Sequence, residues 1–547
     1  MATINCDPTQ LILYANTLYD AENYKKALKV YLIALKYITN KDHEQKLHHR
    51  IGEIYLHHTN SPEHAIAHFN KVIASSSLES NDIRYMYYDS LLSAYALKLD
   101  SFGVKQFERI IDEAKEMKEF RWVYHFSLKL VKSYFSHSSF PHSDGLVHIQ
   151  KAFQYASDNK HEEMKIYLYI FKASLFLQIG ELNEMDTLVS QIHEIIRSFE
   201  IGKTEFTSVY WGLKVHVLLI EIIHNLVLGH SETLVKQINQ AMDILNTKLP
   251  DEIELPFDLE WISRDQLYII LFLFAGSCKM VESIPHAVKV FEAGLAHVHE
   301  VESNCEPNWL NFLRQQLYSK LFDCSIAECR VAEASILLEK LIACISDNEL
   351  EDRAALVCIK KAMLVQLEGQ DPTEYLQTAF NLSTDKFEKA FCQLTLAQIG
   401  ICSDQPFDTT PLKTEYSLTE SLKASISLLK GVEYLKSEDR HRAKALVLNA
   451  LKTANGVLQN TQLKYLSLMV LGHLYIGVDL TQSERMFASA YLLTKKDGNT
   501  LCSYTLGILL SDAFKASKKM DKYKLQIEQN HKDAAKLEEN KIEVRIK

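Results

Sequence analysis

The sequence predicts an all-α fold built from repeated pairs of antiparallel helices, and three observations support this. The first is size: 547 residues, 47% hydrophobic and 24% charged, are enough to bury a large core. The second is a shortage of turn residues, with 17 glycines and 10 prolines, well below their average shares of about 7% and 5%. The third is a recurring pattern of small and large apolar residues. Together they nearly exclude β-sandwiches, barrels and propellers and disfavour nucleotide-binding α/β folds.

The recurring pattern is clearest in residues 11–34, which contain two amphipathic segments joined by a polar turn. The small residues Ala15 and Ala27 would let two helices approach closely. The large residues Leu18 and Tyr31 would fill the space between them. This spacing fits the tetratricopeptide (TPR) repeat, a helix pair of about 34 residues.

The same pattern returns along the chain, with a small residue in a first helix followed by larger ones in a second. The pairs are Gly52 with Phe69, Ala173 with Val189 and Ile192, Ala275 with Phe291, Gly431 with Val447, and Gly472 with Ala488 and Tyr491. About eleven to thirteen such units would cover the chain. The sequence therefore predicts a TPR-like superhelix, an α-solenoid.

The predicted organisation is one array over residues 1–514, followed by a charged helix or tail over residues 515–547. Residues 402–411 (CSDQPFDTTP) are the best candidate for a hinge. The tail begins with a lysine-rich run, KASKKMDKYK. We interpret this run as a solvated helix face rather than a nuclear-import or phosphate-contact patch. The sequence does not define how the repeats align between residues 305 and 412.

Charge and cysteine usage limit the function. The net charge of −10 is opposite in sign to that of a protein that grips DNA by itself. None of the ten cysteines stands in a CxxC pair, which favours buried free thiols in a reducing compartment. The N-terminus does not read as a signal peptide. Leu267–Ser277, interpreted as the most apolar stretch, is too short to span a bilayer, so we expect no membrane contact.

No catalytic motif is found: GxGxxG, GxxxxGK[ST], HExxH and GxSxG are absent. One cluster of histidines is a candidate metal site, and it comprises His48, His49, His57, His58, His64 and His68. His64 and His68 share a helix face, but no cysteine or convergent carboxylate completes a ligand set. We therefore expect no enzyme activity, no cofactor and no metal. A metal-dependent enzyme remains the rival hypothesis.

In a TPR array the first helices line a concave surface, and many residues predicted there are large and apolar. The predicted lining is Ile12, Asn16, Tyr19, Lys46, His49, Glu53, Tyr167, Ile170, Leu177, Ile269, Phe272, Leu428, Leu435, Met469 and His473. Exposed hydrocarbon on this scale favours a partner chain that fills the groove. Packing of the array against itself is the alternative.

Three segments resemble one known family. They are Arg50–Val72, which contains the triplet His57-His58-Thr59 followed by Asn60, then Leu249–Gly276 with its acidic loop and single tryptophan, and Leu463–Ile476. In order and spacing they are similar to the TPR subunit of the cohesin loader, the companion of a large Nipped-B-type HEAT-repeat protein. The similarity extends across nearly the whole chain.

This resemblance implies a non-catalytic subunit that wraps the N-terminal segment of the large loader protein in a 1:1 heterodimer. Contact with cohesin would be indirect, and DNA would be contacted mainly through the partner. The resemblance also implies nuclear localisation and a role in sister-chromatid cohesion and chromosome segregation. The alternative is another TPR scaffold, of the anaphase-promoting-complex or chaperone-adaptor type.

Overall fold

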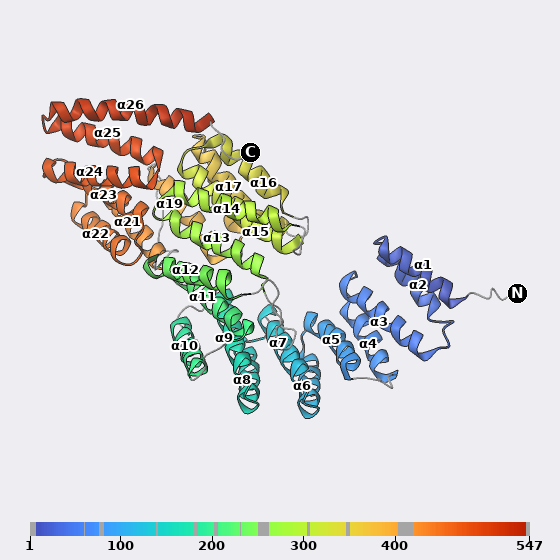
Figure 1. Ribbon diagram of the computed structural model, residues 1–547. Coiled ribbons are helices and arrows are strands. Elements are labelled where there is room, and N and C mark those ends of the chain that lie inside the picture. The colour runs from blue at the N-terminus through green and yellow to red at the C-terminus, as the bar shows by residue number, and fades with distance from the viewer. Residues whose placement is uncertain are drawn as a thin grey trace. The chain divides into compact units, whose positions relative to one another are not determined.

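The computed structural model describes residues 7–59, 61–75, 81–137, 140–179, 184–201, 206–229, 231–249, 262–302, 307–345, 350–402 and 419–542. These residues form 25 helices and no strand, which confirms the predicted all-α fold (Figure 1). In the described part, the helices follow one another as twelve consecutive pairs plus α19. This agrees with the expected number of repeats.

The chain divides into two compact units, residues 1–213 with 253–261 and residues 214–252 with 262–547. Unit 1 holds α1 (Pro8–Asp20), α2 (Tyr24–Ala34), α3 (Lys41–His57), α4 (Pro62–Ser75), α5 (Asn81–Leu97), α6 (Ser101–Glu116), α7 (Phe120–Ser136), α8 (His142–Asp158), α9 (Glu162–Ile179), α10 (Met185–Glu200) and the start of α11 (Ser208–Leu228). Unit 2 holds the rest of α11, α12 (Ser231–Thr247), α13 (Arg264–Met280), α14 (Ile284–Val301), α15 (Pro307–Ala327), α16 (Val331–Ala343), α17 (Leu350–Leu367), α18 (Thr373–Leu382), α19 (Lys386–Cys402), α21 (Glu420–Lys436), α22 (Arg440–Gly456), α23 (Thr461–Tyr475), α24 (Leu480–Asp497), α25 (Thr500–Ala516) and α26 (Met520–Ile542). The single array predicted over residues 1–514 stays a prediction.

Within a pair, a small residue on the first helix accepts a large side chain from the second, as predicted. A Cβ atom added to Gly52 would lie 2.5 Å from the ring of Phe69. A Cβ atom on Gly431 would lie 2.5 Å from Cγ2 of Val447. Both Phe69 and Val447 are fully buried. The missing side chain therefore sets how closely the two helices pack.

The predicted register is wrong in two repeats. In α13 the ring of Phe291 packs on Gly276 rather than on Ala275. In α24 it is Phe487 that packs on Gly472, while Ser483 donates a hydrogen bond to the carbonyl of Gly472 at 2.8 Å. The sequence pattern had placed Ala488 and Tyr491 there. Adjacent small residues, or adjacent apolar ones, make a one-residue shift invisible in the sequence.

Tight turns form without glycine. Glu22, Lys118, Lys160, Glu438 and Lys518 adopt left-handed backbone angles, with φ between 57° and 63°. In each turn the next residue's N–H bonds to the carbonyl five residues before it, as in Asn23 to Leu18 (2.8 Å). This is the hydrogen-bond pattern of a Schellman motif, which satisfies the last carbonyls of a helix. A glycine-poor sequence can thus still make sharp helix–helix turns.

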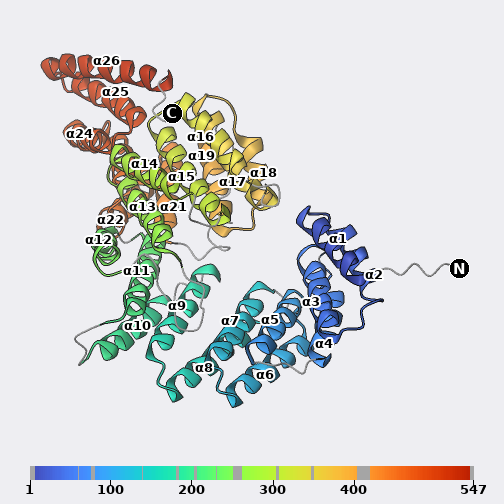
Figure 2. The same cartoon turned by 45° about the vertical axis from the view of Figure 1, so that its right-hand side comes forward.

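First helices of neighbouring repeats contact one another directly. The contacts join α3, α5 and α7 in unit 1, and α13, α15, α17, α19, α21 and α23 in unit 2. Figure 2 shows the pairs α3/α4, α5/α6 and α7/α8 stacked side by side. In each unit the first helices therefore form the tightly curved, inner side of the stack.

The last repeats of unit 2 fold back onto its earlier ones. The N–H of Thr461 donates to the carbonyl of Val281 at 3.3 Å, and α26 packs against α16. The buried side chain of Asn540 donates to the carbonyl of Glu328 at 2.8 Å. Unit 2 is therefore closed by contacts between residues that are far apart in the sequence.

The C-terminal region predicted as a charged helix or tail contains α26, which is docked on one face. Its polar residues Gln526, Asn530 and Asp533 are buried. Asp533 accepts hydrogen bonds from Tyr491 and Lys495. The lysines of residues 515–524 are exposed. The docked face lies after this run and packs through buried polar side chains. The predicted hinge, apart from Cys402 at the end of α19, lies outside the described residues.

Helix α11 is the most apolar helix described, in place of the stretch at Leu267–Ser277. By length and composition alone it could cross a membrane, with a mean hydropathy of 1.5 over a window that is 56% buried. Buried core helices of soluble proteins can be equally long and apolar. Within α11 the buried Glu221 accepts a hydrogen bond from Gln237 of α12 at 2.6 Å, which is the contact of a core helix.

Candidate functional site

The inner face of unit 1 carries a row of polar and aromatic side chains that links successive first helices. Between α1 and α3, the guanidinium of Arg50 lies 3.9 Å from the ring centroid of Tyr19. Arg50 also pairs with Glu53 at 3.2 Å. The ring of His58 stacks on Tyr24 at 3.5 Å, and its Nε2 lies 3.4 Å from the Tyr19 hydroxyl.

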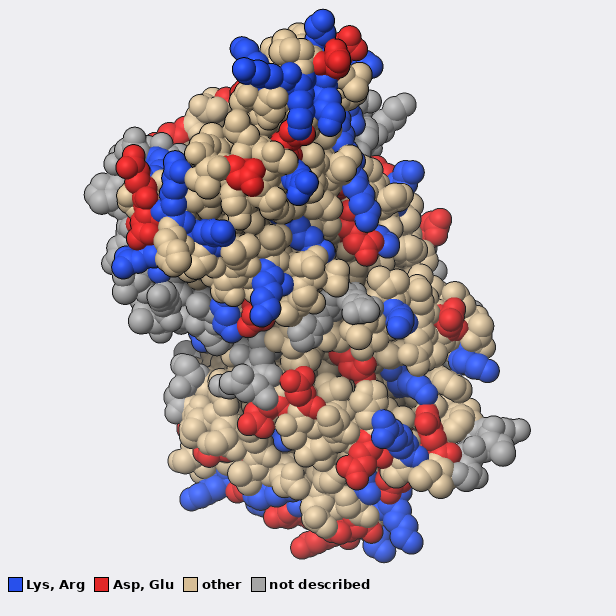
Figure 3. Space-filling view, turned by 90° about the vertical axis from the view of Figure 1, so that its left-hand side faces the viewer, with Lys and Arg blue, Asp and Glu red and all other residues tan. Residues whose placement is uncertain are grey.

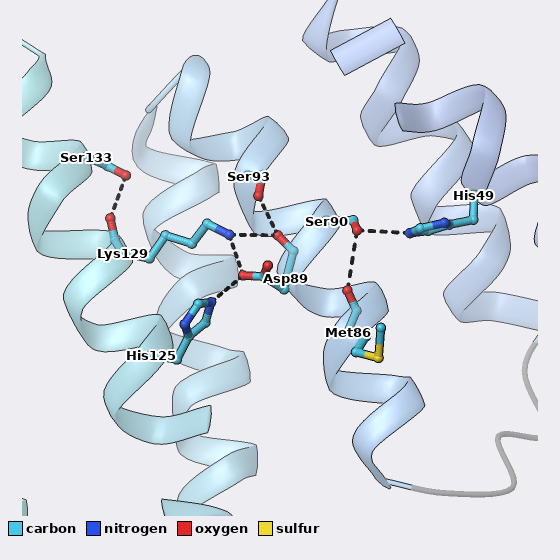
Figure 4. Close-up of polar contacts among 8 residues, drawn as sticks. All are labelled: His49, Met86, Asp89, Ser90, Ser93, His125, Lys129 and Ser133. Carbon is cyan, nitrogen blue, oxygen red and sulfur yellow. Dashed lines mark hydrogen bonds and ion pairs between the residues drawn. The ribbon is translucent and has the colours of Figure 1, made fainter. Parts of the chain in front are cut away.

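The row continues from α3 to α5 through His49. Its Nε2 lies 3.0 Å from the hydroxyl of Ser90, and its ring lies 5.0 Å from that of Tyr87. Figure 4 shows His49 reaching across to Ser90, which in turn donates to the carbonyl of Met86. Burial lowers the pKa of His49, so this residue is neutral at physiological pH.

Asp89 joins α5 to α7. Its carboxylate lies 2.7 Å from Nε2 of His125 and also receives the ammonium of Lys129. Lys129 donates in addition to the Asp89 carbonyl at 3.1 Å (Figure 4). Burial alone would raise the pKa of Asp89, but the His125 hydrogen bond and the Lys129 charge hold it below its ordinary value. The side chains stay 22% to 37% exposed, so the row is accessible.

Of the residues predicted for unit 1, Tyr19, His49 and Glu53 belong to this row. Asn16 and Lys46 are exposed, whereas Ile12, Tyr19, His49, Glu53, Tyr167 and Leu177 are half-buried. Ile170 is only 8% exposed, so it packs between helices and is not available to a partner in this structure. The binding role of the other residues stays a prediction.

In unit 2 the inner face is mostly apolar. Ile269 is fully buried between helices because Gly276, and not Ala275, is the small residue of α13. This shift of one residue assigns Ile270, Leu273 and Met280, which are half-buried, to the inner face in its place. Leu428 is only 9% exposed. The predicted residues Leu435, Met469 and His473 are half-buried. Phe272, counted from the same shifted frame as Ile269, packs against Gly294 and His297 of α14 instead. Ile269 and Leu428 are therefore not available to a partner.

Sequence reasoning missed three residues of the row in unit 1 and the apolar inner face of α25. Asp89, His125 and Lys129 lie in repeats where a bulky residue replaces the small residue of the first helix. Without that small residue the sequence does not show which positions face inward. In α25, Ile508 follows Gly507, whose missing side chain makes room for Asn530. The detectable signal is spacing: Asp89 is 36 residues before His125 and 40 before Lys129, about one repeat length.

The histidine cluster packs ring against ring. Nδ1 of His48 lies 2.9 Å from Nδ1 of His68, and Tyr55 stacks on His64 at 5.1 Å. Among the residues that the structure describes, no group of three or more His, Cys, Asp or Glu side chains is arranged to hold a metal ion. Burial and the neighbouring His48 lower the pKa of His68 from 6.5 to about 4.

Acid is expected to lower the free energy of unfolding of unit 1 through His68, which packs against His48. His68 is neutral in the folded state down to about pH 4, whereas the unfolded side chain takes up a proton below pH 6.5. Its stabilising contribution is therefore complete above pH 6.5 and is lost as the pH falls toward 4. Because His68 is partly exposed, we expect a loss of about 1 kcal/mol at pH 5. Urea unfolding at pH 7.5 and 5 measures it. His68→Asn, which keeps a polar group but does not titrate, should lose less, and an equal loss would contradict this explanation.

A hollow of about 470 Å³ lies beside the turn between α13 and α14. Its lining includes Lys279, Lys289, His286 and Lys496, and Glu282 pairs with Lys279 at 2.9 Å. The lining is mainly cationic and open. It presents no carboxylate pair or activated nucleophile of the kind that catalysis requires.

The seven cysteines that the structure describes in full have free thiols, as expected. Cys278, Cys324, Cys329 and Cys392 are buried. Burial raises the pKa of Cys278, Cys329 and Cys392 to about 11. These thiols are therefore protonated at neutral pH and behave as packing residues.

Comparison with known proteins agrees with this architecture. A family model described as cohesin loading factor matches residues 25–406. The MAU2 chromatid cohesion factor homolog of Aedes aegypti is 22% identical over 308 residues, which are 52% of this chain. The match spans about half (50%) of that relative's length. The crystal structure of Scc4 in complex with Scc2n and Ctf19n shows the same fold, with a TM-score of 0.56, 12% identity and 93% of each chain covered. Because the family model covers well over half of the sequence, this chain belongs to the cohesin loading factor family.

Proposed function

We propose that this chain is a non-catalytic subunit of the cohesin loader and holds the N-terminal segment of the large Nipped-B-type loader protein. Membership of the cohesin loading factor family supports the role, and Scc4, which has the same fold, has been crystallised with Scc2n. In this proposal the complex is a 1:1 heterodimer that works in the nucleus. Cohesin is engaged through the partner.

The observation that carries the proposal is the accessible chemistry of the inner faces. Unit 1 offers partly exposed polar side chains beside aromatic rings, including Glu53 and His125, which are paired with Arg50 and Asp89 but stay accessible. Unit 2 offers exposed apolar side chains on a first helix, α25, where Leu501 is 44% and Ile508 39% exposed. An extended or locally helical segment that is disordered alone would gain both hydrogen bonds and apolar burial here.

Two aspartates on the inner face of unit 2 should weaken capture of the loader segment by at least tenfold. The variant is Leu501→Asp with Ile508→Asp, because a charge placed against a bound apolar side chain is left unpaired and desolvated. The measurement is titration calorimetry of the full chain with the loader's N-terminal segment. Both side chains are already exposed, so the melting temperature of the free chain should change little.

Leu448 provides the matched control. It is 44% exposed on α22, a second helix. Leu448→Asp should alter the affinity by less than twofold. Failure of the wild-type chain to form a 1:1 complex, or equal loss in both variants, would refute the proposal.

A further inference from the structure

One end of the last repeats of unit 2 is basic although the chain as a whole is acidic. We call it the basic edge and define it by Arg440 and Lys444 at the start of α22 and by Lys515, Lys518, Lys522 and Lys524 around the turn between α25 and α26. Figure 3 looks onto this end, and Lys and Arg side chains gather at the top of the view, over the start of α26. Residues 515–524 contain five lysines and one aspartate, in a chain of net charge −10.

Most of this positive charge is available to a ligand. All six side chains of the basic edge are exposed. Within the described residues, Lys515, Lys518 and Lys524 form no ion pair. Lys519 and Lys522 share a single carboxylate, that of Glu484, at 2.5 and 4.0 Å. Glu438 and Asp439 precede Arg440, and Asp521 lies within the lysine run. The lysines of residues 515–524 outnumber these acidic neighbours, so the edge keeps an excess of positive charge.

Aromatic rings position part of the edge. The ammonium of Lys444 lies 5.1 Å from the ring centroid of Tyr475, on the next repeat. The ammonium of Lys522 lies 5.7 Å from that of Phe514. Such contacts restrict long side chains and lower the entropy lost when they bind an anion.

The two basic clusters flank an acidic turn. The turn between α23 and α24 lies between them in the stack and carries the exposed Asp479, which caps α24. Packed helices lie about 8–10 Å apart, so the clusters are roughly 20 Å apart across two repeats. A flexible acidic peptide would follow the surface and meet Asp479. A rigid polyanion would bridge both clusters above it.

We propose that the basic edge binds the phosphate backbone of duplex DNA without reading its sequence. A duplex carries one charge per about 1.7 Å, so a 20 Å contact faces on the order of ten phosphates. Exposed lysines contact phosphates as point charges, which position a duplex without reading its bases. The contact is made by this chain itself and does not depend on the groove or its partner.

The test is fluorescence anisotropy of the full chain with a labelled duplex of about 30 base pairs at several salt concentrations. The variant Lys515→Glu, Lys518→Glu, Lys524→Glu should bind at least tenfold more weakly than wild type. The slope of log affinity against log salt should become shallower by about two to three, as expected for the loss of three phosphate contacts.

The matched control reverses three exposed lysines of α2, Lys25, Lys26 and Lys29, and so makes the same change in net charge. It should bind within twofold of wild type. Equal weakening in the two variants would show a net-charge effect and overturn the proposal. Polyglutamate that competes as well as unlabelled duplex would also overturn it, because the occupant would then be an acidic peptide. Thermal melting should show that both variants stay folded.

Discussion

Replacing Gly276 with leucine is expected to lower the free energy of unfolding of unit 2 by about 3 kcal/mol or more. A Cβ atom at this position would lie 2.3 Å from the ring of Phe291, which is fully buried. Helices α13 and α14 both contact α15, so they cannot separate from each other without breaking those contacts. The strain caused by the added side chain is therefore not relieved. Urea unfolding followed by circular dichroism measures the loss.

Gly456, the last residue of α22, is the control for this substitution. An added Cβ atom there meets nothing within 4 Å. Gly456→Leu should leave stability unchanged or raise it by up to about 1 kcal/mol through helix propensity. If Gly276→Leu proves as harmless as Gly456→Leu, close helix packing at the small position is not what holds the repeat together.

Replacing Asp497 with asparagine is expected to stabilise unit 2 by about 2 kcal/mol at pH 8. Asp497 is the last residue of α24 and is fully buried, and neither carboxylate oxygen has a well-formed hydrogen bond within the described residues. The neighbouring Tyr465 hydroxyl offsets only part of the cost of burial. Burial raises its pKa from 3.8 to about 7. A shift of this size corresponds to about 4 kcal/mol, of which we expect half to be recovered because the amide also lacks partners.

The pH dependence identifies the cause. The unfolded carboxyl ionises above pH 3.8, whereas the folded one stays protonated up to about pH 7. The wild-type chain therefore loses stability between these values, and the advantage of Asp497→Asn should grow over the same range and level off above it. Asp512→Asn, at an exposed position on α25, should show no such trend. A gain that is already complete at pH 4 would rule out ionisation as the reason.

The fold was predictable because helix pairing depends on a contrast of size that survives in the sequence. Gly52 with Phe69 and Gly431 with Val447 are each correct to the residue. At Ala275 and Gly276 two small residues are adjacent, and only the three-dimensional position of Phe291 decides between them. The error then passes to every residue counted from that frame, which is why Ile269 was assigned to the inner face.

The candidate site was predictable only where the repeat frame could be set. His49 and Glu53 follow from Gly52 and lie on the inner row of unit 1. Asp89 and His125 do not, because their repeats replace the small residue with aromatic packing around Trp122 and Phe126. Polar residues on the inner face do not pack in the core. The periodic spacing of apolar residues, which marks core positions, therefore does not show where they lie.

The closure of unit 2 has a consequence for how the protein is made. Asn540 contacts the carbonyl of Glu328 across 212 residues. At 5–20 residues per second, a ribosome needs roughly 10–40 s to travel between these two codons. Throughout that interval the turn between α15 and α16, with Glu328 and Arg330, and Glu333 at the start of α16 lack their final cover. The nascent chain therefore displays charged groups destined for the interior, a window in which a chaperone can hold it.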